Sequence, residues 1–286
     1  MANLKEIRNR ISSVSSTMQI TSAMKMVSAA KLKKAQDAIT AMRPYANKLT
    51  ELLQNLSATL DADSGSKYAT QREVNNVLIV TITSNRGLCG AFNSNIIKQT
   101  QNLIGNVYAD KKVSVLAIGK KGNDAFTKQS MVIANKSEVF DDLTFDNVAN
   151  IAEILMDKFV TGEFDKIEIV YNKFKNAATQ IVMTEQFLPI VPIEGNSNSN
   201  QDYIFEPSKV EIVETLIPKS LKTQLYKSIR DSFASEHGAR MTAMHKATDN
   251  ATELRDQLKL TYNKARQAAI TNEILEIVGG AEALNN

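Results

Sequence analysis

Mostly apolar side chains recur at alternating steps of three and four residues along the N-terminal segment. They are Leu4, Ile7, Ile11, Val14, Met18 and Thr21, and the same frame resumes at Leu32 and continues through Leu49, Leu53 and Leu56 to Leu60. This spacing is the heptad seam of a coiled coil. Pro44 removes one backbone hydrogen bond, so we expect it to kink the helix rather than end it. The pattern predicts a coiled-coil helix over residues 1–60.

The N-terminal seam is interrupted at Lys25 and Ser28. In this interval the apolar residues move to neighbouring positions, namely Ala23, Met24, Met26, Val27, Ala29 and Ala30. Two interpretations stay open. The apolar side of the helix turns toward something other than its seam partner, or the register shifts within the same coiled coil.

The C-terminal segment carries a similar seam. It comprises Met244, Ala247, Ala251, Leu254, Leu258, Thr261, Ala265 and Ala268, and a shifted stripe follows at Ile270, Ile274, Ile277, Ala281 and Leu284. Pro218 suits the first helical position, and only Gly238 weakens the helix before Gly279 and Gly280. Neither terminal helix can bury its stripe alone. We therefore expect residues 208–286 to pack against residues 1–60 as an antiparallel coiled coil.

The middle of the chain has a different hydrophobic pattern, with short apolar runs in place of a heptad seam. Its strand-like runs are VLIVTIT (77–83), KVSVLAIG (112–119), KIEIVYNKF (166–174) and TQIVMTEQFLP (179–189). Helical stretches at 92–104 and 148–160 alternate with the first three runs, which predicts a largely parallel sheet. The expected fold class is α/β plus long helices: an antiparallel two-helix coiled coil with a small Rossmann-like α/β domain at 74–206.

Charge is distributed unevenly. Residues 1–48 carry nine basic and two acidic side chains, a net charge of +7, whereas the whole chain has a net charge of only +3. Such a segment is expected to face an acidic partner, whether protein, nucleic acid or lipid surface. No stretch approaches the ~20 apolar residues of a membrane span, and the N-terminus lacks the apolar run of a secretory signal. We expect a soluble or peripheral protein.

The loop SNRGLCGAFN (84–93) is the best candidate for chemistry, because it joins a predicted strand to a predicted helix. It matches neither the GxxxxGK-[ST] phosphate loop nor the GxGxxG dinucleotide fingerprint, although a simple anion site at the helix start stays open. Cys89 is the only cysteine, and a nucleophilic role would need a nearby histidine. His237 and His245 both fall on the C-terminal helix, eight residues apart and unlike a zinc pair. We expect no catalytic residues, cofactor or metal, and no enzyme.

Four segments resemble the signatures of the γ subunit of F-type ATP synthases. IRNRISSVSSTMQITSAMKMVSAAKLKKAQ (7–36) resembles the N-terminal signature, and the loop at 84–93 is similar to the central motif. ASEHGARMTAMHKATDNA (234–251) and LTYNKARQAAITNEILEIVGGAEAL (260–284) resemble the C-terminal signature. They occur in the family's order over nearly the full length. Asn85 stands where the family often has aspartate, which puts a local charge pairing in doubt.

The resemblance implies a central rotor shaft, bacterial in type, that couples ion-driven rotation of the c ring to ATP synthesis at the β-subunit sites. Its partners would be the α and β subunits of the surrounding hexamer, the ε subunit and the c-subunit ring. The membrane would be reached only through these partners, at the cytoplasmic face of the bacterial inner membrane. The alternative is a basic coiled coil that binds nucleic acid. Residues 1–48 contain one aromatic side chain, Tyr45, and no groove-reading pattern, which disfavours it.

The resemblance also implies which residues touch partners. The central loop, with Arg86, Gly87 and Cys89, would lie near the acidic lever segment of a β subunit. The other implied contacts are Met24, Lys25, Met26, Lys31, Lys33 and Lys34 on the N-terminal helix, Arg266 and Gln267 as a catch on a β-subunit loop, and Ile274, Ile277, Ala281 and Leu284 in an apolar bearing. Plain alternatives stay open: the lysines solvate a helix, Arg266 forms an intrahelical pair, and the glycines serve turn geometry.

Overall fold

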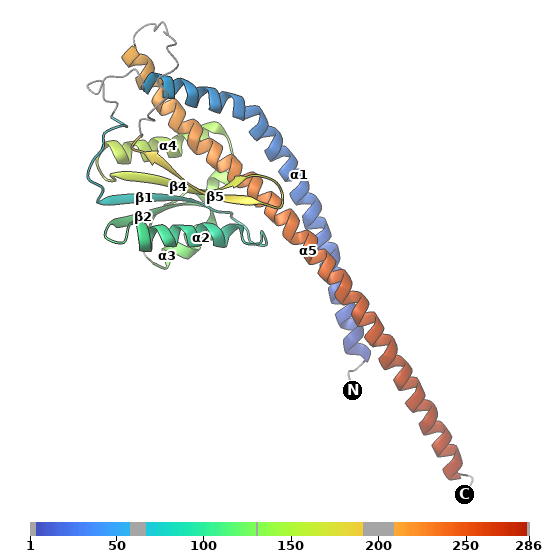
Figure 1. Ribbon diagram of the computed structural model, residues 1–286. Helices are drawn as coiled ribbons and strands as arrows, with labels where there is room; N and C mark the ends of the chain where they lie inside the picture. The colour runs from blue at the N-terminus through green and yellow to red at the C-terminus, as the bar shows by residue number, and fades with distance from the viewer. Residues whose placement is uncertain (1–3, 58–66, 130, 191–208, 285–286) are drawn as a thin grey trace. The chain divides into compact units, whose positions relative to one another are not determined.

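The computed structural model describes residues 4–57, 67–129, 131–190 and 209–284 (Figure 1). The chain forms two compact units, one from Ala29–Arg240 and one from Met1–Ser28 with Met241–Asn286. Two long helices contribute to both units: α1, Leu4–Ser57, and α5, Lys209–Leu284. The domain limits at 1–60, 74–206 and 208–286 stay a prediction, because residues 58–66 and 191–208 lie outside the described part of the chain.

The larger unit contains a five-stranded sheet in the order β3-β2-β1-β4-β5. The strands are β1 Asn76–Ile82, β2 Lys112–Ile118, β3 Val132–Asn135, β4 Lys166–Phe174 and β5 Gln180–Leu188. Strand β1 pairs in parallel with β2 and β4, β2 pairs in parallel with β3, and β5 is antiparallel to β4. The largely parallel, Rossmann-like sheet is confirmed. The edge strand β3 was not predicted, because four residues are too few to show a period.

Short helices cover both faces of this sheet (Figure 1). On one face lie α2, Phe92–Asn102, which continues as a π-helical turn at Leu103–Val107, and α3, Lys120–Thr127. On the other lies α4, Phe145–Val160, preceded by a 3₁₀ turn at Ser137–Phe140. Strand β1 shows why both faces need cover: Val77 and Ile79 pack with Ile96 of α2, whereas Leu78 and Val80 pack with α4. A largely apolar run suits such a central strand.

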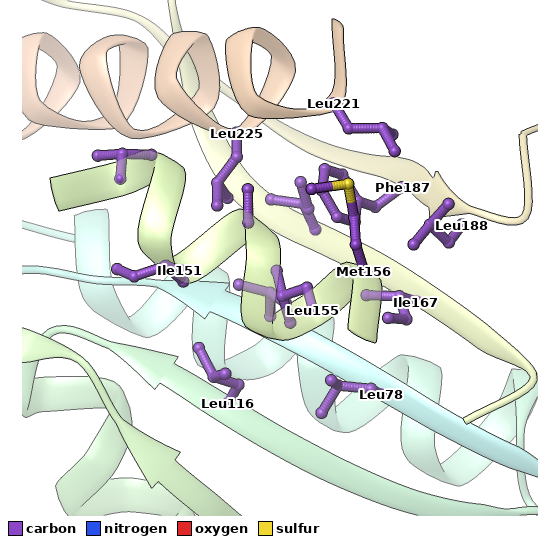
Figure 2. Close-up of a cluster of buried hydrophobic side chains, with 14 of the residues drawn as sticks. Leu78, Leu116, Ile151, Leu155, Met156, Ile167, Phe187, Leu188, Leu221 and Leu225 are labelled. Atoms are coloured by element: carbon purple, nitrogen blue, oxygen red, sulfur yellow. The ribbon is translucent and has the colours of Figure 1, made fainter. Parts of the chain in front are cut away.

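The first part of α5 packs against α4 in the main core. Figure 2 shows Leu221 and Leu225 of α5 above Leu155 and Met156 of α4. Helix α5 begins at Lys209, so the predicted start at Pro218 is wrong. Proline inside a helix loses one backbone hydrogen bond. The adjacent Ile217, 7% exposed in the core, helps to hold the helix together across the proline.

The N-terminal seam is confirmed wherever the side chains of α1 are described. In the larger unit its buried members are Leu32, Ala35, Ile39, Ala46 and Leu49. The helix passes through Pro44 without ending, as expected. The seam positions Leu53, Leu56 and Leu60 lie outside the described side chains. In the smaller unit, Ile7 and Thr21 are buried and Leu4, Ile11, Val14 and Met18 are half-buried.

The interruption at Lys25 and Ser28 is not a register shift. Ser28 is buried at 3% exposure and Lys25 is half-buried, so the seam continues through these two polar residues. Met26 and Val27 are 65% and 58% exposed. Of the two interpretations, the structure supports the first: the apolar side of α1 faces away from its seam partner here.

Four cross-helix contacts make the pairing of α1 and α5 in the smaller unit antiparallel. Their partners are Arg8 with Tyr262, Met18 with Thr252, Thr21 with Thr248, and Lys25 with His245. As residue number rises in α1, it falls in α5. The predicted antiparallel coiled coil is therefore confirmed in this unit.

The predicted positions of the α5 seam are partly wrong. From Met244 onward, the buried or half-buried residues are Met244, Ala247, Thr248, Ala251, Thr252, Arg255, Leu258, Tyr262 and Ala265, whereas the predicted Leu254, Thr261 and Ala268 are exposed. The prediction relied on apolar side chains, but four of these nine positions carry polar side chains. Tyr262 accepts a hydrogen bond from Arg8 (2.8 Å), and a guanidinium nitrogen of Arg255 lies 3.5 Å from the sulfur of Met18.

Candidate functional site

The central loop, residues 84–90, leaves the C-terminal end of β1 and leads into α2. The hydroxyl of Ser84 donates to the carbonyl of Arg86 (2.6 Å), and the amide of Asn93 donates to Ser84 Oγ (2.8 Å) and to the sulfur of Cys89 (3.2 Å). Leu88 and Gly90 adopt left-handed φ values of 63° and 59°. The loop is thus a tight, internally bonded turn. Its apex, Arg86 to Leu88, is exposed, while Cys89 is buried beneath it.

Asn85 connects this loop to two other segments. Its side-chain amide donates to the carbonyl of Ser137 (3.0 Å), and its side-chain oxygen accepts from the backbone N–H of Lys120 (3.0 Å). An aspartate would keep the acceptor but lose the donor. The departure from the family pattern therefore replaces a charge by a two-sided hydrogen bond.

Arg240 of α5 binds the backbone of the central loop through hydrogen bonds. Its guanidinium donates to the carbonyl of Arg86 (3.1 Å) and to that of Gly87 (3.3 Å). It also forms an ion pair with Glu236, one turn earlier on α5, at 2.6 Å. Both charged side chains are largely buried, at 9% and 11% side-chain exposure. Buried charges of this kind are retained when they are paired and fully hydrogen-bonded.

Burial changes the protonation of the groups below the loop. Burial raises the pKa of the Cys89 thiol, so this sulfur is a poor nucleophile at neutral pH. Burial also raises the pKa of Glu236, while the neighbouring Arg240 opposes that shift. His237 is buried against Phe233, and burial, with the charges of Arg240 and Lys31, lowers its pKa to about 3. His237 is therefore neutral, and the environment suits packing rather than acid–base catalysis.

Helix α5 lies over the end of the sheet where α/β folds usually bind ligands. In such sheets the ligand crevice lies beyond the carboxyl ends of the strands, where the strand order reverses. Here the hydroxyl of Ser235 donates to the carbonyl of Asn172 at the end of β4 (2.9 Å). A Cβ on Gly238 would lie 3.2 Å from the Cα of Ala177. The chain's own helix thus occupies a position that a dinucleotide takes in related topologies.

Two kinds of small-molecule site, a metal site and an anion site at the start of α2, can be compared with the described part of the chain. Within it, no group of three or more His, Cys, Asp or Glu side chains could hold a metal ion. At the start of α2, the N–H of Phe92 already donates to the carbonyl of Cys89 (3.3 Å). None of the described helices is both long and apolar enough to cross a bilayer.

The predicted contact residues fall in both units. In the larger unit, Arg86 and Gly87 are exposed, Cys89 is 2% exposed, and Lys31, Lys33 and Lys34 are exposed. Lys33 pairs with Asp37 on the same helix at 2.9 Å, which favours its plain structural interpretation. In the smaller unit, Met24 and Lys25 are half-buried, whereas the exposed residues are Met26, Arg266, Gln267, Ile274, Ile277 and Ala281. The side chain of Leu284 is not described.

Sequence reasoning gave no role to the residues that support the loop. These are Asn93 on α2 and the pair Glu236 and Arg240 on α5. The available signal was the Glu-to-Arg spacing of four residues within ASEHGARM, a segment otherwise of small and apolar residues, where a charged pair is expected to be buried together.

Comparison with known proteins gives one family over the whole chain. The family model described as ATP synthase matches residues 3–284. The ATP synthase gamma chain of Flavobacterium psychrophilum is 78% identical over 285 residues, covering 99% of both chains. That of Flavobacterium johnsoniae is 77% identical over 286 residues, covering all of both chains. The nucleic-acid-binding alternative receives no support.

Solved structures agree in fold. A chain of the Euglena gracilis mitochondrial ATP synthase, solved as its OSCP/F1/c-ring portion, has a TM-score of 0.69 at 23% identity and covers 98% of this chain and 94% of its own. One from the central stalk and c ring of the Tetrahymena thermophila enzyme has a TM-score of 0.60 at 24% identity, over 80% and 99%. At these identities the likeness concerns the fold. Together with the full-length relatives, these findings place the chain in the gamma-chain family of F-type ATP synthases, as a non-catalytic subunit of that complex.

Proposed function

We propose that this chain is the central rotor shaft that couples ion-driven rotation of the c ring to ATP synthesis at the β-subunit sites. The observation that carries the proposal is the 78% identity to an ATP synthase gamma chain over the full length. The solved structures of similar fold belong to the central stalk, c-ring and F1 portions of such enzymes. The proposed partners are accordingly the α and β subunits, the ε subunit and the c-subunit ring.

The shape of the smaller unit suits a shaft. Two antiparallel helices bury a shared seam and leave side chains exposed on their outer faces, so the pair is stiff and has a distinct chemistry on each side. A shaft that presents different faces as it turns can bias the populations of surrounding subunits, because each face has a different affinity for each conformation. No chemistry is required of the shaft itself.

Three sets of residues are proposed for partner contact. The first is the apex of the central loop, with Arg86 and Gly87; buried Cys89 would support it from below rather than touch a partner. The second is on α1 in the smaller unit, where Met26 is exposed and Met24 and Lys25 are half-buried. Lys33, in the larger unit, is proposed as a separate contact. The third is the polar pair Arg266 and Gln267, followed by the apolar residues Ile274 and Ile277, which are 54% and 69% exposed.

The proposed location is the cytoplasmic face of the bacterial inner membrane, where the chain would be peripheral through its partners. Its basic segment, residues 1–48, would then face acidic protein surfaces rather than lipid. Release of the assembled enzyme from membranes should carry this chain away together with the α and β subunits.

The proposal is tested by reconstitution. Purified α and β subunits are assayed for ATP hydrolysis with and without this chain, and the chain is assayed alone. The expected result is that the chain alone is inert but assembles with α and β into a sustained ATPase. If the chain neither joins them nor changes their activity, the rotor proposal is wrong.

The contact at Arg266 has its own test in membrane vesicles that carry the whole enzyme. Arg266→Glu is expected to reduce ATP synthesis about tenfold, because charge reversal at an interface costs both the attraction and the complementarity. Lys264→Glu makes the same charge change at another exposed position of the same helix and serves as the matched control. Equal synthesis by the two variants would remove Arg266 from the contact surface.

A further inference from the structure

We propose that Arg240 is the positioning residue of the central loop: it fixes the exposed apex at Arg86 and Leu88 to the shaft helix α5, so that movement of the helix is transmitted to the contact surface. This inference rests on the proposed role of the loop as a partner contact. It adds a residue that does not itself face a partner, because Arg240 is only 7% exposed.

The carbonyl of Arg86 is the point at which the bonds of the loop converge. It accepts from the hydroxyl of Ser84 at 2.6 Å and from the guanidinium of Arg240 at 3.1 Å. The next carbonyl, that of Gly87, accepts from two nitrogens of the same guanidinium, each at 3.3 Å. A planar fork of donors can hold two neighbouring carbonyls in one orientation, which a single ammonium cannot do. The backbone from which the Arg86 and Leu88 side chains project is thereby set by Arg240.

The direction of the guanidinium is set in turn by Glu236. The carboxylate lies on the same helix and one turn away, and it accepts a hydrogen bond from Nη1 at 2.6 Å. His237 also contacts this ion pair, because its Nδ1 lies 3.5 Å from Nη1 of Arg240. The arginine is therefore held by its own helix on one side and holds the loop on the other. This arrangement links the loop to the turn of α5 that carries Glu236 and Arg240.

The loop also needs an external support. Leu88 has a φ of 63°, a conformation that a side chain other than glycine rarely adopts, and it is 64% exposed. Strained backbone persists only where the surrounding structure over-determines it. Burial of Leu88 contributes little at this exposure, so the bonds from Arg240, Ser84 and Asn93 hold the turn.

The first test uses Cys89 as a reporter of loop opening, because it is the only cysteine in the chain and is buried under the loop. Purified full-length chain is treated with a thiol-reactive maleimide, and the rate of Cys89 labelling is measured. Arg240→Ala is expected to raise the rate about tenfold, because loss of charged hydrogen bonds favours local opening. Arg240→Lys should give an intermediate rate. Glu236→Gln combined with Arg240→Ala removes the orphaned carboxylate and should still label fast.

Arg230 provides the matched control. It lies on the same helix, is half-buried, and donates to a different carbonyl, that of Leu143, at 2.8 Å. Arg230→Ala should leave Cys89 labelling near the rate of the unaltered chain. If Arg230→Ala raises labelling as much as Arg240→Ala does, the effect is general loosening of the fold and the positioning role is wrong. Unchanged labelling in Arg240→Ala overturns it as well.

The second test asks whether Arg240 acts through the loop in the assembled enzyme. ATP synthesis in vesicles is measured for Arg86→Ala, Arg240→Ala and the double variant. If Arg240 works by placing Arg86, the double variant loses no more than about the larger single loss, whereas independent roles multiply. Multiplying losses overturn the inference. Failure of the unaltered chain to support synthesis would instead refute the rotor proposal, so the two outcomes are distinguishable.

Discussion

At the scale of single residues, the tightest backbone constraint among the described glycines lies at Gly119, between β2 and α3. Gly119 has a φ of 118°, and a Cβ there would stand 2.1 Å from the carbonyl oxygen of Thr83. Gly119→Ala is therefore expected to lower the free energy of unfolding by about 2–4 kcal/mol, through combined strain and displacement of Thr83, the residue after β1. Urea unfolding of the full-length chain, followed by circular dichroism, measures this loss.

Gly279→Ala is the control for that substitution. Gly279 is helical and exposed, and a Cβ there would meet nothing within 4 Å. Alanine should be neutral or stabilise by up to about 1 kcal/mol, because it restricts the unfolded chain and favours helix. Similar unfolding curves for the two variants would contradict the constraint at Gly119.

His237 predicts a dependence of stability on pH. Its pKa in the folded chain is lowered to about 3 by burial and by nearby charges, whereas the unfolded histidine titrates near pH 6.5. Below pH 6.5 the unfolded state therefore binds more protons, so stability is full above that pH and falls as the pH drops toward 3. The expected loss is at most about 1.4 kcal/mol per pH unit. Urea unfolding at pH 7.5, 6.5 and 5.5 measures it.

The variant His237→Gln separates this effect from other titrating groups. It should flatten the curve between pH 6.5 and 5.5, whereas His245→Gln, at an exposed position, should not. The raised pKa of Glu236 works in the opposite direction, because the folded state then takes up a proton first. That contribution is common to both variants. Parallel slopes in the unaltered chain and in His237→Gln would refute the assignment.

Residue roles were the least predictable part of this chain. The buried state of Cys89 depends on Asn93 and on α5, which approaches from 150 residues later in the sequence. In the sequence, Arg240 is one of many basic residues. Its role becomes visible only in the structure, where its guanidinium donates to the carbonyls of Arg86 and Gly87. Local patterns report periodicity and turn chemistry, but such contacts between distant segments leave no local pattern.

At the scale of elements, the corrected seam of α5 gives a prediction opposite to that from hydrophobicity. Ala251 is 8% exposed and faces α1, whereas the more apolar Leu254 is 47% exposed. Ala251→Glu is expected to cost about 2–4 kcal/mol, because it forces a charge into the seam. Leu254→Glu should cost about 1 kcal/mol or less. Thermal unfolding of both full-length variants compares them, and a larger loss for Leu254→Glu would restore the predicted seam.

Elements with a long or strong pattern were predictable, and short or polar ones were not. The four predicted strands begin and end within one residue of β1, β2, β4 and β5. The runs of β1, β2 and β4 are largely apolar and leave little alternative in a sheet covered on both faces, whereas the edge strand β5 is mixed and ends in the buried Phe187 and Leu188. The predicted seam of α5 was partly wrong because Thr248, Arg255 and Tyr262 face inward and contact side chains of α1. Polar seam residues are specified by the partner helix, which the sequence of α5 alone does not contain.

At the scale of the whole molecule, the family could be predicted because signature segments mark both ends and the middle of the chain. The coiled coil could be predicted because apolar residues recur at heptad spacing in both terminal segments. The division into two compact units could not. Both long helices run on through the change of unit, between Ser28 and Ala29 and between Arg240 and Met241. A continuous helix gives no break in periodicity, and the change depends only on what each stretch packs against.

The exposed apolar residues at the end of α5 lead to two predictions: replacing them should improve the behaviour of the free chain but impair the assembled enzyme. Ile270, Ile274, Leu275, Ile277 and Val278 are each at least 47% exposed, and contiguous apolar surface promotes association when it is uncovered. Ile274→Lys combined with Ile277→Lys should reduce self-association of the free chain, measured by sedimentation velocity. The same variant should weaken sustained ATP hydrolysis after assembly with α and β several-fold, because the proposed apolar bearing would have to bury two charges.

The matched control, Glu273→Lys with Glu276→Lys, makes a larger charge change on the same two turns without removing apolar area. If both double variants behave alike, net charge rather than the apolar stripe governs the behaviour of this end.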